Sequence, residues 1–144
     1  MKLPQKPRVL FIAEPDTSEY EYIFAKFHLG FLRLGCELAQ LDPFKTSLEL
    51  YKRTVEALRP DIIFGMLRNT ESVRACSDLL AQYHPTVALN WFQEDPNNVT
   101  AELLECSRRF DYWFTQDARM LPFWRTKAHQ GALLSSRIRR DGLL

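Results

Sequence analysis

The sequence predicts an α/β fold, a Rossmann-like doubly wound parallel sheet of five strands with helices on both faces. Short continuous apolar runs, typical of strands buried on both faces, alternate with stretches in which apolar residues recur at helical spacing. Alternation of this kind implies right-handed crossovers between parallel strands. The expected strand order is 3-2-1-4-5. The chain has 144 residues, which fits one domain with a sizeable core.

The first half of the chain holds two strand–helix units and a third strand. The first strand is expected over residues 8–13, and the helix after it is expected over residues 20–34 with Gly35 as its stop. A weaker second strand follows over residues 37–41. Ser47 is expected to cap the second helix, which Pro60 closes, and the third strand covers residues 61–65.

The second half continues the alternation. A third helix is expected over residues 73–83, a fourth strand over residues 86–92, and a fourth helix that buries Leu103 and Leu104. The fifth strand covers residues 111–115, and a short helical pattern follows over residues 118–127. We expect residues 1–130 to form the domain. Residues 131–144, with three arginines and little apolar periodicity, are expected to form a poorly ordered basic tail.

Composition excludes several classes of protein. The net charge of +1 gives no general attraction for nucleic acid or for an anionic membrane. Cys36, Cys76 and Cys106 are far apart and have no zinc-ligand spacing, so they are expected to be free thiols in a reducing compartment. The chain contains no run near the roughly 20 apolar residues of a membrane span, and we expect a cytoplasmic location.

Ligands of open parallel sheets bind at the carboxyl ends of the strands, where the strand order reverses. In the expected order this point lies between the first and fourth strands. Glu14 and Asp16 should then face Glu94 and Asp95, with Arg68 nearby and Asp117 after the fifth strand. The sequence thus predicts an edge of the sheet that is rich in carboxylates.

These carboxylates allow three interpretations. One of them acts as a general base, several hold a divalent metal ion, or they cap the helices that follow. Asp95 fits the capping interpretation least well, because neighbouring Trp91 and Phe92 would desolvate it and raise its pKa. Trp91 itself either packs in the core or stacks on a sugar or base.

Several nucleotide- and phosphate-dependent activities lack the residues that they need. The chain has neither GxGxxG nor GxxxxGK[ST]. A receiver domain needs an aspartate at the end of the third strand and a lysine at the end of the fifth. This chain has Met66-Leu67-Arg68 and Gln116-Asp117 there.

Four segments carry a resemblance to a known family: Arg8-Val-Leu-Phe-Ile, Arg59-Pro-Asp-Ile-Ile-Phe, Val87-Ala-Leu-Asn-Trp-Phe-Gln-Glu-Asp-Pro96 and Phe110-Asp-Tyr-Trp-Phe-Thr-Gln-Asp117. Over residues 8–127 the chain resembles the N-terminal domain of the CgeB-like (spore-maturation type) glycosyltransferases of the GT-B fold. The resemblance implies the acceptor-side half of an enzyme that transfers a sugar from a nucleotide sugar to a hydroxyl group.

The resemblance also implies roles for individual residues. Asp95, or Glu94 in its place, would be the catalytic base, and the acceptor would lie against Glu14, Asp16, Arg68, Trp91 and Asp117. No metal or cofactor is implied. The donor domain has no counterpart in this chain, because the gene is truncated or because a partner chain supplies a nucleotide-sugar site. The chain alone is therefore expected to be inactive.

Two hypotheses remain beside the glycosyltransferase half. The chain is a stand-alone Rossmann-like module that binds a ligand or a protein without catalysis, or it is a small enzyme that uses its carboxylates with a metal ion. Loss of a covering donor domain would also expose an apolar surface around the fifth strand and favour self-association.

Overall fold

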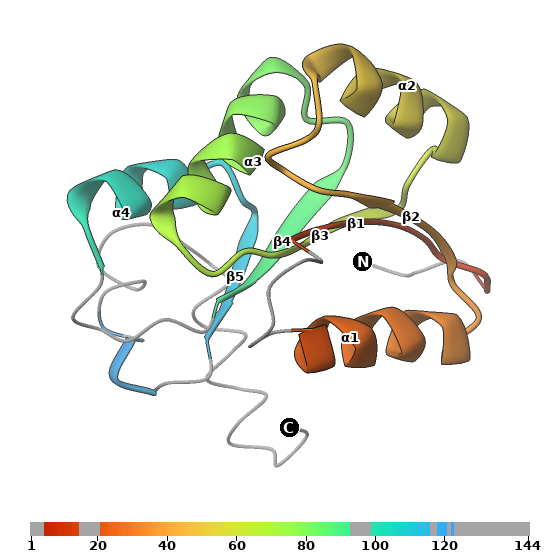
Figure 1. Ribbon diagram of the computed structural model, residues 1–144, viewed down its shortest axis with the longest axis horizontal. Helices are drawn as coiled ribbons and strands as arrows, with labels where there is room; N and C mark the ends of the chain where they lie inside the picture. The colour runs from red at the N-terminus through yellow and green to blue at the C-terminus, as the bar shows by residue number, and fades with distance from the viewer. Residues whose placement is uncertain (1–4, 15–20, 93–98, 116–117, 121, 123–144) are drawn as a thin grey trace.

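The computed structural model describes residues 5–14, 21–92, 99–115, 118–120 and 122. In this part of the chain, five parallel strands form one sheet with helices on both faces, as the sequence predicts (Figure 1). The strands are β1 (Arg8–Ala13), β2 (Glu37–Leu41), β3 (Ile62–Met66), β4 (Val87–Phe92) and β5 (Tyr112–Thr115). The helices are α1 (Glu21–Arg33), α2 (Leu48–Leu58), α3 (Thr70–Gln82), α4 (Ala101–Ser107) and the 3₁₀ helix Ala118–Met120.

The strand order is β2-β1-β3-β4-β5, so the expected order 3-2-1-4-5 is wrong. Strand β3 pairs with β1 and not with β2. The burial of the strands accounts for the difference. Residues 9–13 of β1 are all buried, whereas β2 buries only Leu41 among its five residues. A half-exposed strand can lie at the edge of a sheet, while a strand that is apolar on both faces needs a neighbour on each side.

The two faces of the sheet carry different cores. Helices α2, α3 and α4 cover one face and α1 covers the other (Figure 1). The first face is mostly aliphatic and includes Leu10, Ile63 and Leu80. On the second face, aromatic residues of α1 pack on Phe11, Phe64 and Trp91. The ring of Phe11 stacks on that of Phe24 with centroids 5.3 Å apart.

Local signals in the sequence set the helix ends. Ser47 caps α2 as predicted, since its hydroxyl accepts the N–H of Leu50 at 3.1 Å. Gly35 ends the α1 turn with a φ of 75°, in the region that favours glycine. Asp42 does not cap a helix. Its carboxylate accepts the N–H of Phe44 within the turn before α2. Among the described residues, no helix has the length and hydropathy of a membrane span.

Candidate functional site

The observed strand order moves the switch point to the crevice between β1 and β3. The chain passes from β1 outward to β2 on one side, and then to β3 on the other side of β1. The loops that follow β1 and β3 therefore meet at the carboxyl edge of the sheet. The last paired residues of the two strands are Ala13 and Met66. Glu14 follows the first of them directly, and Leu67 and Arg68 follow the second.

Glu14 and Arg68 form an ion pair at this switch point. The guanidinium Nη2 of Arg68 donates to Oε2 of Glu14 at 3.1 Å. The side chain of Arg68 is 17% exposed and that of Glu14 is 11% exposed. The other carboxylate oxygen, Oε1, is buried and has no hydrogen-bond partner in the described part of the chain. Both side chains are half-buried, so removing one of them would leave the charge of the other without its partner in a place that water reaches poorly.

The position of Arg68 depends on Asn90, a fully buried residue of β4. Oδ1 of Asn90 accepts the N–H of Leu67 at 3.2 Å, which fixes the chain just before Arg68. Gly65 makes room for this amide, since a Cβ at that position would lie 2.5 Å from Oδ1. On the other side of Arg68, Asn69 caps α3 by accepting the N–H of Ser72 at 2.8 Å. Arg68 is therefore held between two structured segments.

Asn90 was not among the site residues predicted from the sequence, although its place in an apolar run is a signal of a structural role. An asparagine inside the apolar run Val87–Phe92 is a buried polar group, and such a group needs a hydrogen-bond partner. The partner is Leu67, which lies just after β3 and 23 residues earlier in the chain. A single sequence does not show which strand supplies it.

Trp91 belongs to the aromatic core under α1. Its ring lies 5.1 Å from that of Phe27, and its backbone pairs with Met66 in the sheet. It is half-buried. This contact agrees with the core-packing interpretation of Trp91 and leaves its outer edge partly exposed.

The structure brings together two of the predicted site residues, Glu14 and Arg68. Strand β3 lies between β1 and β4, so these two strands are not neighbours as expected. The predicted site residues Asp16, Glu94, Asp95 and Asp117 lie outside the described residues.

The described residues offer little for nucleophilic or metal chemistry. No group of three or more His, Cys, Asp or Glu side chains that could hold a metal ion is found among them. The three cysteines are free, as predicted; Cys76 is buried, while Cys36 and Cys106 are half-buried. Burial raises the pKa of the Cys76 thiol to about 12, which keeps it protonated and unreactive.

The comparisons with known proteins add a fold likeness only. Neither a protein-family model nor a curated protein matches the sequence. A solved structure of a two-component response regulator of the LuxR family from Aurantimonas sp. SI85-9A1 is similar to this chain. The alignment covers 96% of this chain and 99% of the other, with 10% identity and a TM-score of 0.46. At that similarity it carries no argument about activity.

The expected resemblance to the CgeB-like glycosyltransferases is corrected by these findings. Neither a family model nor a curated protein of that family matches the chain, and the similar structure bears the name of a response regulator. The strand order also differs from the 3-2-1-4-5 order that placed Asp95 opposite Glu14. The interpretation as a glycosyltransferase half is therefore wrong. The base role of Asp95 or Glu94 and the nucleotide-sugar partner depended on it and are not carried forward.

Proposed function

We propose that this chain is a protein-binding module that recognises an amphipathic helix of another protein through the outer face of α1. One observation carries the proposal. Leu29, Leu32 and Leu34, at the carboxyl end of α1 and just after it, are 49%, 48% and 74% exposed. Leu29 and Leu32 are three residues apart and so are neighbours on α1, and neighbouring exposed leucines are typical of surfaces that bind another protein.

The exposed leucines have no place in the core of this chain. The inward side of α1 is already occupied by Phe24, Phe27 and Phe31, which pack on the rings of β1 and β3. Leu29 and Leu32 are three residues apart and lie on the opposite side of the helix. The sheet therefore cannot bury them, and a partner can.

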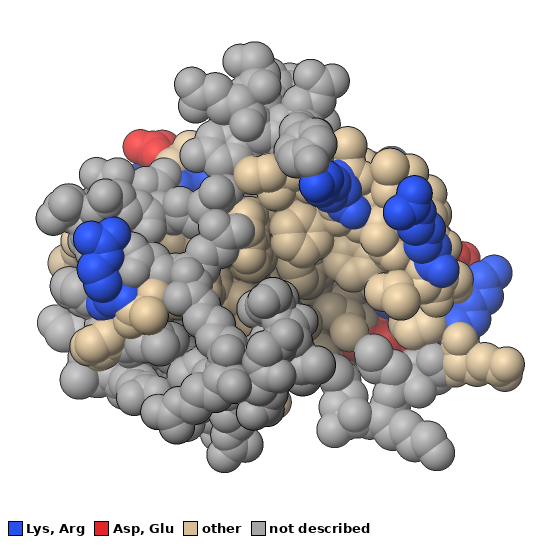
Figure 2. All heavy atoms as spheres, turned by 90° about the horizontal axis from the view of Figure 1, so that it is seen from below, with Lys and Arg blue, Asp and Glu red and all other residues tan. Residues whose placement is uncertain are grey.

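Charge beside the leucines indicates the chemistry of the partner. Lys26 and Arg33 are exposed and lie along one flank of Leu29, since the helical repeat places these two residues on nearly the same side. Figure 2 looks onto the α1 side of the molecule. Among the described residues it shows prominent Lys and Arg side chains and few Asp and Glu atoms. A partner helix with leucines on one face and carboxylates beside them would match this surface.

The described residues of the switch point give no support for a catalytic site. Arg68 holds the charge of Glu14 in a half-buried ion pair, where a base or a metal ligand would need that carboxylate to be available. Strand β3 ends at Met66 without the aspartate that a phosphoacceptor site of a receiver domain needs. We therefore place the function on the surface of α1 and not at the switch point.

The test uses a synthetic helix-forming peptide with leucines at spacings of three and four residues and glutamates on one flank. Fluorescence anisotropy is expected to show binding that weakens at least about tenfold in Leu29→Glu. A peptide with lysines in place of the glutamates should bind more weakly than the acidic one.

A matched control separates this surface from general stickiness. Phe44→Glu puts the same charge on a similarly exposed apolar residue of the turn between β2 and α2. It should leave binding unchanged. The proposal is wrong if the acidic peptide does not bind, if both peptides bind equally, or if Phe44→Glu weakens binding as much as Leu29→Glu does.

A further inference from the structure

Strand β2 has an open edge. In the part of the chain that the structure describes, it pairs with β1 alone and is the outermost strand of the sheet. The N–H of Glu37 donates to the carbonyl of Pro7 at 2.8 Å, so Glu37 turns its backbone groups toward the β1 side. Because these directions alternate along a strand, Leu38 and Gln40 turn their N–H and C=O groups toward the open edge. An open edge of this kind is a template for another strand.

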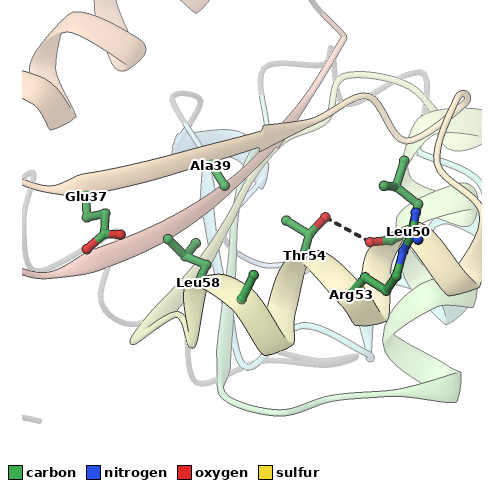
Figure 3. A pocket seen from close by; sticks show the side chains of 7 residues that line it. Glu37, Ala39, Leu50, Arg53, Thr54 and Leu58 are labelled. Carbon is green, nitrogen blue, oxygen red and sulfur yellow. Dashed lines mark hydrogen bonds between the residues drawn. The ribbon is translucent and has the colours of Figure 1, made fainter.

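A groove of about 460 Å³ runs beside this edge, between β2 and α2 (Figure 3). Glu37 and Ala39 line it from β2, and Leu50, Arg53, Thr54 and Leu58 line it from α2. Figure 3 shows Glu37 near Leu58 at one end, and Leu50 with Arg53 at the other. Leu50 is one of the exposed large apolar residues of the described chain. The groove is therefore apolar in its middle and has opposite charges at its two ends.

We propose that the groove and the edge of β2 bind a second copy of this chain, with β2 of each copy antiparallel across a two-fold axis at Ala39. In this register, Leu38 of one copy lies opposite Gln40 of the other. These are the two residues whose backbone groups face the open edge, so each supplies the hydrogen bonds that the other needs. The central pair is Ala39 against Ala39, which is small enough for the close approach of a non-hydrogen-bonded pair.

The charges of the groove are self-complementary under this symmetry. A two-fold axis through Ala39 exchanges the ends of the groove and brings Glu37 of one copy toward Arg53 of the other. Glu37 and Arg53 are both exposed, and neither forms an ion pair within 4.0 Å in the described part of the chain, although the charge of Arg8 lies near enough to Glu37 to act on it. The second copy would supply one to each.

The position of α2 is also compatible with the proposed dimer. Helix α2 packs on β1 and β2, so it lies near the edge of the sheet. With strands about 4.8 Å apart, a two-fold axis beyond β2 places the two α2 helices roughly 10 Å apart, which is a normal distance for packed helices. Leu50, Thr54 and Ala57 lie on one side of α2, because they are spaced by four and three residues. In the proposed dimer, this side of α2 faces the same side of α2 in the second copy. The proposed dimer buries Leu50 and the open edge together.

A charge-reversal experiment tests this dimer. Sedimentation equilibrium on the whole chain should show a monomer–dimer equilibrium at about 10–100 µM. Arg53→Glu and Glu37→Arg should each raise the dissociation constant at least about tenfold, because each places like charges together. The double variant Glu37→Arg/Arg53→Glu should return to within about threefold of the wild-type value.

A control and a second measurement make the outcome decisive. Lys52→Glu makes the same charge change on the same helix, at an exposed residue that does not line the groove, and should leave the dissociation constant unchanged. Amide exchange at Leu38 and Gln40 should slow as protein concentration rises. The proposal is overturned if the wild-type chain stays monomeric, if the double variant does not recover, or if Lys52→Glu weakens the dimer equally. Because the groove lies on the α2 face of the sheet and α1 covers the opposite face (Figure 1), failure of the dimer leaves the proposed function standing, and the converse also holds.

Discussion

At the amino edge of the sheet, Asp61 and Asp111 each stand just before a strand, and each carboxylate accepts the N–H of a neighbouring strand. The distances to the N–H groups of Arg8 and Ala88 are both 2.8 Å. The backbone N–H of each aspartate donates in return to the carbonyl of that same neighbour, again at 2.8 Å. At the carboxyl edge, Glu14 instead pairs with Arg68 away from water.

The difference between the two edges is one of burial and of partners. At the amino edge, Asp61 also binds the guanidinium of Arg8, and Asp111 binds the ring of His84, in pairs that water reaches more readily. The carboxylates of Asp61 and Asp111 therefore stabilise the sheet through their hydrogen bonds to backbone N–H groups. These bonds remain when the charged side-chain partner is removed. At the carboxyl edge, one ion pair occupies the place where an α/β fold binds its ligand. An acidic residue at the end of a strand therefore does not indicate a catalytic or binding role until the group that it pairs with is known.

The largest effect is expected from removing Arg68. Arg68→Met leaves the half-buried carboxylate of Glu14 without its cation, and this should lower the free energy of unfolding by about 2–4 kcal/mol. Chemical denaturation at neutral pH measures it. A loss below about 1 kcal/mol would mean that the pair behaves like the exposed pairs of the amino edge.

Gly65→Ala should have the next largest effect. The added Cβ would lie 2.5 Å from Oδ1 of Asn90 and displace the amide that holds Leu67. We expect a loss of about 1–3 kcal/mol in the free energy of unfolding. In the Asn90→Ala background the same substitution should cost less, because the clash is gone. Equal costs in both backgrounds would show that Asn90 does not fix the turn before Arg68.

A pH-dependent effect is expected at the amino edge. Side-chain and backbone hydrogen bonds from Arg8 lower the pKa of Asp61. A lowered pKa in the folded state means that Asp61 stabilises the fold above its unfolded pKa of about 4, and that this stabilisation is lost as the pH falls through the folded value. Asp61→Asn should therefore cost about 1 kcal/mol at pH 7 and progressively less below about pH 4. Unfolding curves over that range give the difference, and a constant difference at all pH values would contradict the interpretation.

The smallest effect is expected for His84→Ala. The Nε2 atom of His84 lies 2.9 Å from Asp111, but both side chains are largely open to water. Asp111 keeps its hydrogen bond from Ala88 without the ring. The free energy of unfolding should change by less than about 0.5 kcal/mol. A loss comparable to that of Arg68→Met would remove the contrast between the two edges.

The sequence predicted the elements of this fold better than their arrangement. Apolar runs and helical spacing located the five strands and four helices, and Ser47 predicted the start of α2. Nothing in those periodicities says on which side of β1 the next strand pairs, so the strand order was wrong. The even burial of β1 and the exposure of Glu37 and Gln40 in β2 were the signals that could have distinguished a central strand from an edge strand.

The same limit applies to the site and to the exposed surface. Glu14 and Arg68 were predicted near one another, but their pairing needed β3 beside β1, which a single sequence does not reveal. The apolar surface was expected around the fifth strand. Among the described residues, the large apolar side chains that are most exposed lie instead on α1, after it, and at the start of α2: Leu29, Leu32, Leu34, Phe44 and Leu50. Helical spacing identified the inward face of α1 but did not show that leucines on its outer face lack a cover.

The most direct test of the account is a double-mutant cycle on the switch point, with Glu14→Gln, Arg68→Met and the two together. Free energies of unfolding from chemical denaturation give the coupling between the two side chains. If they form one buried unit that closes the crevice between β1 and β3, the coupling should be about 2 kcal/mol or more, with the double variant more stable than Arg68→Met alone. A coupling near zero, with additive losses, would mean that Arg68 does not hold the carboxylate of Glu14. That result would contradict the proposal that the switch point is not the functional site.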